Sequence, residues 1–284
     1  MKSISNHLKP SDIAAQIRME RQKHNGIFLL MEGSTDYKRF EKFFDHDVCN
    51  IINCFGKDNA IGAVDIVQNA GFEDCLAFVD ADFDRIIGNH TPDDDIIYSQ
   101  FHDFDIDICS SEVINRYLSE MAEGKKVNEN GGCAAVTSML LSALRPLSAM
   151  RFANLKHKLG YSLTRVDLEV FFDGSTVNVD KMVDHVSYGR MASENHKSAL
   201  RCLISRYANE DFDIWQFTNG HDFVAALGIA LRDRLGNRNP PQTWRSEVEK
   251  HLRLAFDVND FAQIGLMAKV QKWQAARNVG ILRK

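Results

Sequence analysis

Short apolar runs alternate with amphipathic stretches through the first third of the chain. The runs lie at 27–31, 49–54 and 75–79, and each is followed by polar or glycine-containing residues. After the first run, Tyr37, Phe40 and Phe44 recur at helical spacing. Apolar runs of this length predict buried strands, and their alternation with helices indicates a parallel sheet covered by helices.

The pattern changes in the remainder of the sequence. Residues 96–107 predict a further extended run, and Ser110 or Ser111 is a plausible N-cap for the helix that follows. The polar, glycine-rich segment GKKVNENGG at 124–132 is the best linker candidate. Beyond it, helical periodicity covers most of the chain, interrupted by a short extended piece at 166–172. The segments expected to be helical are 133–158, 181–186, 194–208 and 221–235.

These patterns predict an α/β fold with a mainly parallel sheet flanked by helices, followed by a mainly helical C-terminal region. The expected domains are 1–125, with a core of about 25–120, and 126–284. The length of 284 residues and the 44% of apolar residues are enough for a large core. No stretch approaches the roughly 18 consecutive apolar residues of a membrane span. We therefore expect a cytoplasmic protein with no membrane association and reduced cysteines.

Acidic residues follow two of the predicted strands directly. Glu32 comes after the first run, and Asp80 and Asp82 come after the third. The carboxyl ends of parallel strands open on one edge of a sheet, so these side chains converge if the two strands are neighbours. Clustered carboxylates repel each other unless a cation neutralises them, and oxygen ligands select a hard ion. The sequence therefore predicts a site for Mg²⁺ or Mn²⁺.

Two other interpretations of the aspartates are weaker. Asp80, Asp82 and Asp84 have the spacing that begins a calcium-binding EF-hand loop, but Arg85 occupies the position where that loop needs glycine. A solvated surface loop would explain the charges, but it would not explain why Glu32-Gly33 stands at the matching end of the first strand.

The two acidic motifs resemble the signature of Toprim domains, the catalytic module of topoisomerases, primases and several nucleases. The resemblance rests on Met31-Glu32-Gly33 and on Asp80-Ala81-Asp82, and it covers roughly residues 25–120. In that family the glutamate acts in acid/base or metal-binding roles and the Asp-x-Asp pair binds Mg²⁺. The resemblance implies these roles for Glu32, Asp80 and Asp82, with Asp84 as a further ligand.

Two later segments resemble a narrower branch. The acidic stretch 102–107, with the helix after it, is similar to nuclease-type Toprim proteins of the OLD kind, in which a glutamate is usual at the position of Asp107. Residues 215–222 and the helical end resemble the Toprim effectors of the PARIS phage-defence system. This resemblance implies Asp107 as a metal ligand. It also implies a nuclease that an ABC-type ATPase restrains and that cuts RNA, notably transfer RNA, on infection.

Among Toprim activities, the sequence favours hydrolysis. A topoisomerase needs a tyrosine nucleophile on a further domain, and a primase normally adds a zinc module that the cysteine spacing does not supply. Metal ions that activate water are sufficient for a nuclease of RNA or DNA. A non-catalytic Toprim-like regulatory subunit and a phosphatase or nucleotide hydrolase remain alternatives.

A net charge of −5 means that a nucleic acid would have to be held by local basic groups. Lys57, after the second predicted strand, is a candidate catalytic cation at the acidic edge. Lys156 and Lys158, and Lys269 and Lys272 in a tail that has no acid from 261 onward, are candidate contacts to the nucleic acid. An ordinary surface position is the alternative for each lysine. A homodimer is expected because it could bring a basic surface opposite the acids.

Overall fold

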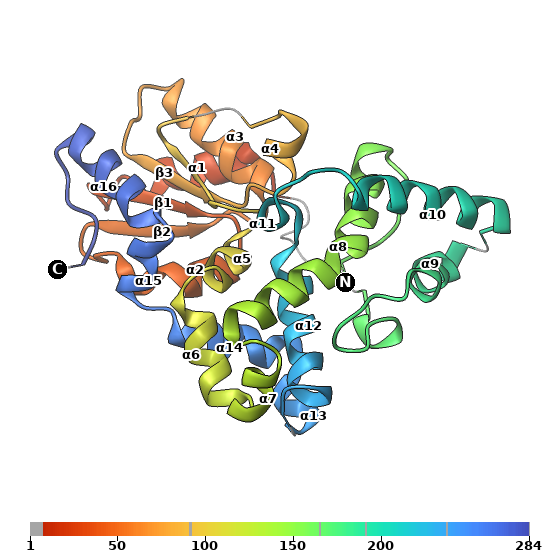
Figure 1. Ribbon diagram of the computed structural model, residues 1–284. Helices are drawn as coiled ribbons and strands as arrows, with labels where there is room; N and C mark the ends of the chain where they lie inside the picture. Colours follow the sequence, from red (N-terminus) through yellow and green to blue (C-terminus); the bar gives the residue numbers. More distant parts are fainter. Residues whose placement is uncertain (1–7, 91–92, 165, 191, 237, 284) are drawn as a thin grey trace. The chain divides into compact units, whose positions relative to one another are not determined.

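The computed structural model describes residues 8–90, 93–164, 166–190, 192–236 and 238–283. Contacts divide the chain into two units (Figure 1). The sheet unit contains the residues up to Ala81, His90–Phe104 and everything from Asp257 onward. The helical unit contains Asp82–Asn89 and Asp105–Phe256. The division differs from the single boundary expected near 125, because the chain passes between the units more than once.

The sheet has four parallel strands in the order β2-β1-β3-β4. Leu30 pairs in register with Ile52 on one side and with Ala77 on the other. This arrangement confirms the predicted α/β fold with a parallel sheet. The strands are β1 (Ile27–Met31), β2 (Cys49–Asn53), β3 (Cys75–Val79) and β4 (Ile96–Tyr98).

The two central strands are buried along their whole length, as their continuous apolar runs predict. On one face of the sheet lie α1 (Pro10–Glu20) and α3 (Lys57–Gln68), whose apolar side chains join the strands in one core cluster. A side chain at Gly62 of α3 would meet the ring of Pro10 at 2.8 Å, so glycine allows these two helices to approach closely.

Aromatic rings cover the other face. Phe40, at the end of α2 (Ser34–Phe40), packs on Phe78 and Phe104 with ring centroids 5.5 and 4.9 Å apart. Phe43, in the 3-10 helix Glu41–Phe43, stacks on Phe261 at 4.6 Å. Phe261 belongs to α15 (Val258–Gln263), which α16 (Leu266–Arg277) follows. The end of the chain is therefore part of the sheet unit.

The expected extended run at 96–107 is only partly correct. Strand β4 ends at Tyr98, and Phe104–Cys109 forms helix α5 instead of extended chain. The sequence FDIDIC alternates apolar and acidic residues, but every one of these six residues is buried, so the alternation does not separate an inner from an outer face. Ser111 caps α6 (Glu112–Met121) as predicted, because its hydroxyl accepts the Val113 N–H.

The helical unit is built around α8 (Cys133–Lys156). Aromatic rings of Phe83, Tyr207, Phe212 and Phe217 surround Phe152 of this helix at 5.0 to 5.9 Å. The elements beside it are α4 (Asp84–Ile87), α7 (Gly124–Glu129), α9 (Val179–Ser187), α10 (Glu194–Ala208), α11 (Ile214–Phe217), α12 (Gly220–Asp233), α13 (Pro240–Thr243), α14 (Arg245–Ala255) and two 3-10 helices, Leu168–Val170 and Tyr188–Arg190.

Two local predictions in this unit differ from the structure. The expected linker at 124–132 contains helix α7, whose preceding residue Glu123 donates its N–H to the Leu235 carbonyl at 2.7 Å. The expected extended piece at 166–172 contains the 3-10 helix Leu168–Val170. The first segment is polar and the second is mainly apolar, but both are short, so local pattern alone does not decide their conformation.

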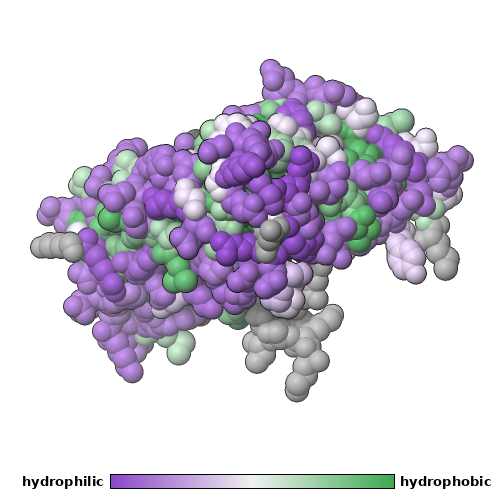
Figure 2. All heavy atoms as spheres, turned by 60° about the horizontal axis from the view of Figure 1, so that its bottom comes forward, coloured by the Kyte–Doolittle hydropathy of each residue, from purple (hydrophilic) through white to green (hydrophobic). Residues whose placement is uncertain are grey.

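One described helix, α8, is long and apolar enough to cross a membrane by length and composition alone. Half of its most apolar window is buried inside the protein, as is typical of a core helix. Figure 2 shows a face of the molecule that is mostly hydrophilic, with small apolar groups between the polar side chains. This face therefore presents mainly polar side chains to its surroundings.

Candidate active site at the edge of the sheet

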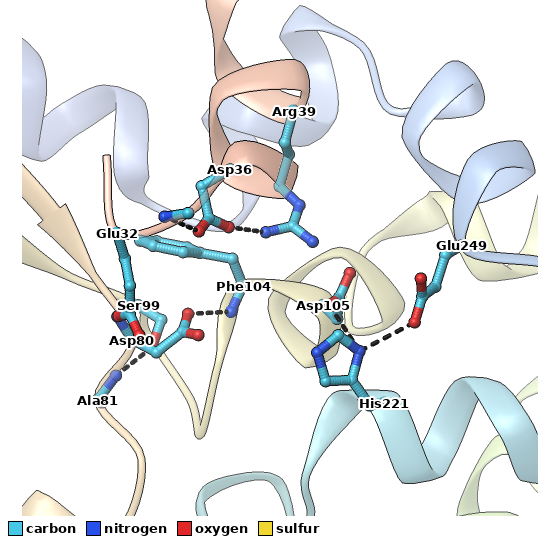
Figure 3. Close-up of polar contacts among 11 residues, drawn as sticks. Glu32, Asp36, Arg39, Asp80, Ala81, Ser99, Phe104, Asp105, His221 and Glu249 are labelled. Atoms are coloured by element: carbon cyan, nitrogen blue, oxygen red, sulfur yellow. Dashed lines mark hydrogen bonds and ion pairs between the residues drawn. The ribbon is translucent and has the colours of Figure 1, made fainter. Parts of the chain in front are cut away.

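Glu32 and Asp80 lie side by side at the carboxyl edge of the sheet. Each residue directly follows its strand, and the two strands, β1 and β3, are neighbours. The Asp80 N–H donates to Oε2 of Glu32 at 3.1 Å (Figure 3). The convergence that the strand pattern predicted for these two acids is therefore present in the structure.

The loop after β4 fixes the direction of Asp80. Its Oδ1 accepts the Phe104 N–H at 2.9 Å. The next residue, Ala81, donates its N–H to the Ser99 hydroxyl at 2.8 Å, and that hydroxyl donates to the Phe101 carbonyl at 2.9 Å. These bonds hold the turn after β3 against the turn after β4, so the Asp80 carboxylate is placed before any ligand arrives.

Lys57 lies at the same edge. It is the first residue of α3, and its Nζ donates to the Ala81 carbonyl at 3.3 Å. The preceding Gly56 donates its N–H to the Glu32 carbonyl at 2.9 Å, which ties the β2–α3 turn to the end of β1. The structure therefore brings together three of the predicted catalytic residues, namely Glu32, Asp80 and Lys57.

Phe55 is an unusual residue in the same turn. Its φ is 57°, in the left-handed region that bulky side chains rarely adopt, and its ring is 51% exposed. Its N–H donates to the Asn53 side chain at 3.1 Å. An exposed aromatic residue in a strained conformation thus precedes Gly56 and Lys57.

Asp36, in the motif after Glu32, has a structural role. Its Oδ2 accepts the Gly33 N–H at 3.1 Å, and its Oδ1 pairs with the Arg39 guanidinium. Both side chains are buried. The Asp36 carboxylate therefore holds in place the first turn of α2, which follows Glu32 in the chain.

Cys54, which follows β2, is buried near the same acids. Burial, and after it the negative charge of Glu32, raises the pKa of the Cys54 thiol to about 12. The thiol stays protonated at neutral pH, and only a thiolate is a strong nucleophile. Cys54 therefore belongs to the core and not to the chemistry of the edge.

The other predicted metal ligands lie in the helical unit. Asp82 has a φ of 50° in the turn after β3, Asp84 begins α4, and Asp107 is fully buried in α5. Asp82 is two residues from Asp80, so chain connectivity alone keeps their Cα atoms within about 7 Å of each other. Asp107 stands on a helix and not on the strand from which its role was inferred.

The lysines that were predicted to contact a nucleic acid lie in different surroundings. Lys156 and Lys158 are exposed at the end of α8, with the Lys156 Nζ 5.3 Å from the Phe152 and Tyr207 rings. On α16, the Lys269 Nζ donates to the Tyr98 carbonyl at 3.0 Å, while Lys272 is 83% exposed and 3.6 Å from Asp94. The tail is thus a helix attached to the sheet unit beside acidic residues.

A second cluster was not predicted. Within the described part of the chain, Asp105, His221 and Glu249 place three potential metal-binding atoms within 4.8 Å of one another. No motif of the sequence points to a metal-binding role for His221. Sequence pattern does not indicate this cluster, because its members come from three separate helices and share no motif.

The chain was compared with models of protein families and with curated proteins. No protein-family model matches the chain, and no curated protein matches it significantly.

Proposed function

We propose that the chain is a metal-dependent nuclease that hydrolyses phosphodiester bonds in RNA or DNA. The observation that carries the proposal is the pairing of Glu32 with Asp80, whose N–H donates to Oε2 of Glu32 at 3.1 Å. Two acids from separate sequence motifs stand together at the edge where ligands of parallel sheets bind. The same two motifs are those that resemble Toprim domains.

The donor set fits a hard divalent cation. Glu32 and Asp80 offer carboxylate oxygens, which suit Mg²⁺ or Mn²⁺, and Asp82 is the next candidate ligand along the chain. Such an ion would supply Lewis-acid stabilisation of the charge that develops on the phosphate and would lower the pKa of a bound water. Asp84 and Asp107 remain predicted ligands.

The protein's own residues have distinct tasks in this proposal. Asp80, held by Phe104, is an oriented oxygen ligand, and Glu32 is the candidate acid/base group. Lys57 places a positive charge beside the acids, where it can attract a phosphate oxygen. The N-terminus of α3 starts at Lys57 and adds a favourable potential for an anion.

We further propose, from the resemblance alone, that the enzyme is a cytoplasmic phage-defence effector that cuts transfer RNA. In that setting an ABC-type ATPase partner restrains it, and it acts as a homodimer. Expression of the chain alone should then slow bacterial growth. Co-expression of the restraining ATPase should relieve the effect.

The direct test is incubation with labelled RNA, DNA and nucleotides in Mg²⁺ or Mn²⁺. We expect cleavage of polynucleotides by the wild type and its loss in Glu32→Gln. Glu73→Gln is the matched control, because Glu73 is an exposed glutamate of the same unit away from the edge, and it should keep full activity. Release of phosphate from nucleotides alone would favour a phosphatase or nucleotide hydrolase. Inactivity of the chain in the absence of the restraining ATPase would favour a regulatory subunit.

A further inference from the structure

Three helices of the helical unit direct metal-binding side chains at one point (Figure 3). Asp105 lies on α5, His221 on the first turn of α12, and Glu249 on α14. The His221 Nδ1 is 2.9 Å from Oε1 of Glu249 and 3.4 Å from Oδ2 of Asp105. The cluster is thus made of one imidazole nitrogen between two carboxylate oxygens.

These distances match the edges of a metal coordination polyhedron. Zinc binds nitrogen and oxygen at about 2.0–2.2 Å, so two ligands at a tetrahedral angle lie about 3.4 Å apart. The two measured distances are close to this value, and all three atoms lie within 4.8 Å of one another. Only small side-chain movements would seat an ion among the three atoms.

A hydrogen bond from His221 pairs with the two carboxylates less completely than a metal ion between the three side chains would. The Nδ1 of a histidine carries at most one proton, and one N–H cannot point well at two carboxylates in different directions. Arg245 also contacts the cluster, with its Nε 3.3 Å from Oε1 of Glu249, so its guanidinium shares that oxygen with His221. A dication would contact all three side chains at once.

The accessibility of the three residues differs in a way that suits an exchangeable ion. Side-chain exposure is 11% for Asp105 and 13% for Glu249, but 46% for His221. A cavity of about 300 Å³ adjoins the histidine, and Asp222, Thr243, Trp244 and Arg245 are among the residues that line it. Three protein ligands with one accessible side are typical of a site that keeps a position for water or another small ligand.

We propose that Asp105, His221 and Glu249 bind a first-row transition-metal dication, with Zn²⁺ as the best fit to the nitrogen and oxygen donors. The donor set distinguishes this site from the edge of the sheet, where the proposed ligands are carboxylates alone. It does not depend on nuclease activity. Its metal would hold α5, α12 and α14 together at their junction.

The test is metal binding by calorimetry and by the visible absorption of Co²⁺, which reports a nitrogen-containing tetrahedral site. Glu32→Gln with Asp80→Asn serves as the background, so that an ion at the sheet edge is not counted. We expect one equivalent of Zn²⁺ or Co²⁺ to bind, and the affinity to fall at least about tenfold in His221→Ala and in Glu249→Gln. His196→Ala, a histidine on the surface of α10, is the control and should bind as the background does.

One further variant and one further measurement make the outcome decisive. Arg245→Gln removes the competing guanidinium and should tighten metal binding. Zn²⁺ should also raise the melting temperature of the background protein but not that of His221→Ala, whose fold is checked by circular dichroism. Unchanged binding in folded His221→Ala would overturn the proposal. So would a folded background protein that takes up no metal, since the cluster would then be an ion-pair network at the helix junction.

Discussion

Glu32 and Asp80 are 48 positions apart in the chain, yet the Asp80 N–H donates directly to a Glu32 carboxylate oxygen at 3.1 Å. The bond exists because β1 and β3 are adjacent parallel strands whose ends differ by only one residue in register. It also brings two negative side chains close together, which is unfavourable unless a cation or hydrogen bonds compensate.

Asp80→Ala should lower the free energy of unfolding by about 1–3 kcal/mol, because it leaves the Phe104 N–H without its carboxylate acceptor. Asp80→Asn keeps an oxygen at that position and removes a charge beside Glu32. It should therefore be at least as stable as the wild type while losing divalent-metal binding at the edge. Urea unfolding and calorimetry measure both effects. Equal destabilisation by the two variants would contradict the assigned role of the Phe104 bond.

Phe55→Asn should raise the free energy of unfolding by about 1 kcal/mol, because asparagine tolerates the left-handed conformation at φ 57° much better than phenylalanine. Phe55→Ala is the control, since alanine keeps the Cβ atom and with it the strain. A gain of the same size in Phe55→Ala would mean that removal of the exposed ring, and not the backbone, is responsible. Denaturant midpoints distinguish the two explanations.

The C-terminal helix should detach when Asp95 is removed. Oδ1 of Asp95 accepts the Trp273 indole N–H at 2.7 Å and pairs with the Arg277 guanidinium. Asp95→Ala leaves both groups without their carboxylate partner and should lower the free energy of unfolding by about 3–5 kcal/mol. Trp273→Phe loses one hydrogen bond and should lower it by about 1 kcal/mol. Limited proteolysis should cut α16 early in Asp95→Ala only. A protease-resistant α16 in that variant would show that apolar packing alone holds the helix.

Asp173 should titrate at unusually low pH. The N–H groups of Thr176 and Ser175 donate to its carboxylate and lower its pKa to about 2. A lowered folded pKa means that this carboxylate stabilises the fold above its ordinary pKa near 3.8 and that the contribution is lost as the pH falls toward about 2. The side chain is exposed, so solvent screening keeps the stability change small.

A carbon-13 NMR titration of the Asp173 carboxyl measures this directly. Thr176→Val removes the hydroxyl that donates to Oδ2 at 2.9 Å and should move the midpoint partway upward. A wild-type midpoint near 3.8 would mean that the turn does not hold these donors in solution.

The exposed lysines should contribute unequally to nucleic-acid binding. Lys269 donates to a backbone carbonyl and Lys272 lies near Asp94, so a phosphate at the tail would meet local negative charge. Neutralising Lys156 and Lys158 should therefore reduce the salt dependence of RNA affinity by up to about one unit of slope per lost contact. The same change at Lys269 and Lys272 should have less effect. Measurements in the Glu32→Gln background avoid cleavage of the RNA. A larger effect at Lys269 and Lys272 than at Lys156 and Lys158 would assign RNA binding to the tail.

The sequence alone determined the first three strands and the edge at which Glu32 and Asp80 meet. Continuous apolar runs can be buried on both faces only in the middle of a covered sheet, and the carboxyl ends of parallel strands share one edge. These features depend on local pattern and on a general rule of topology. The predicted strands at 27–31 and 75–79 and the helix at 194–208 accordingly agree with the structure.

Tertiary structure decided what local pattern leaves open. The segment Phe104–Cys109 has the alternation of a strand but is buried on all sides as a helix. The basic C-terminal helix belongs to the sheet unit because Trp273 and Arg277 find Asp95 there. His221 gains its two acidic neighbours from distant helices. In each case the deciding contact joins residues far apart in the chain, and its free energy depends on burial and partners that no window of sequence contains.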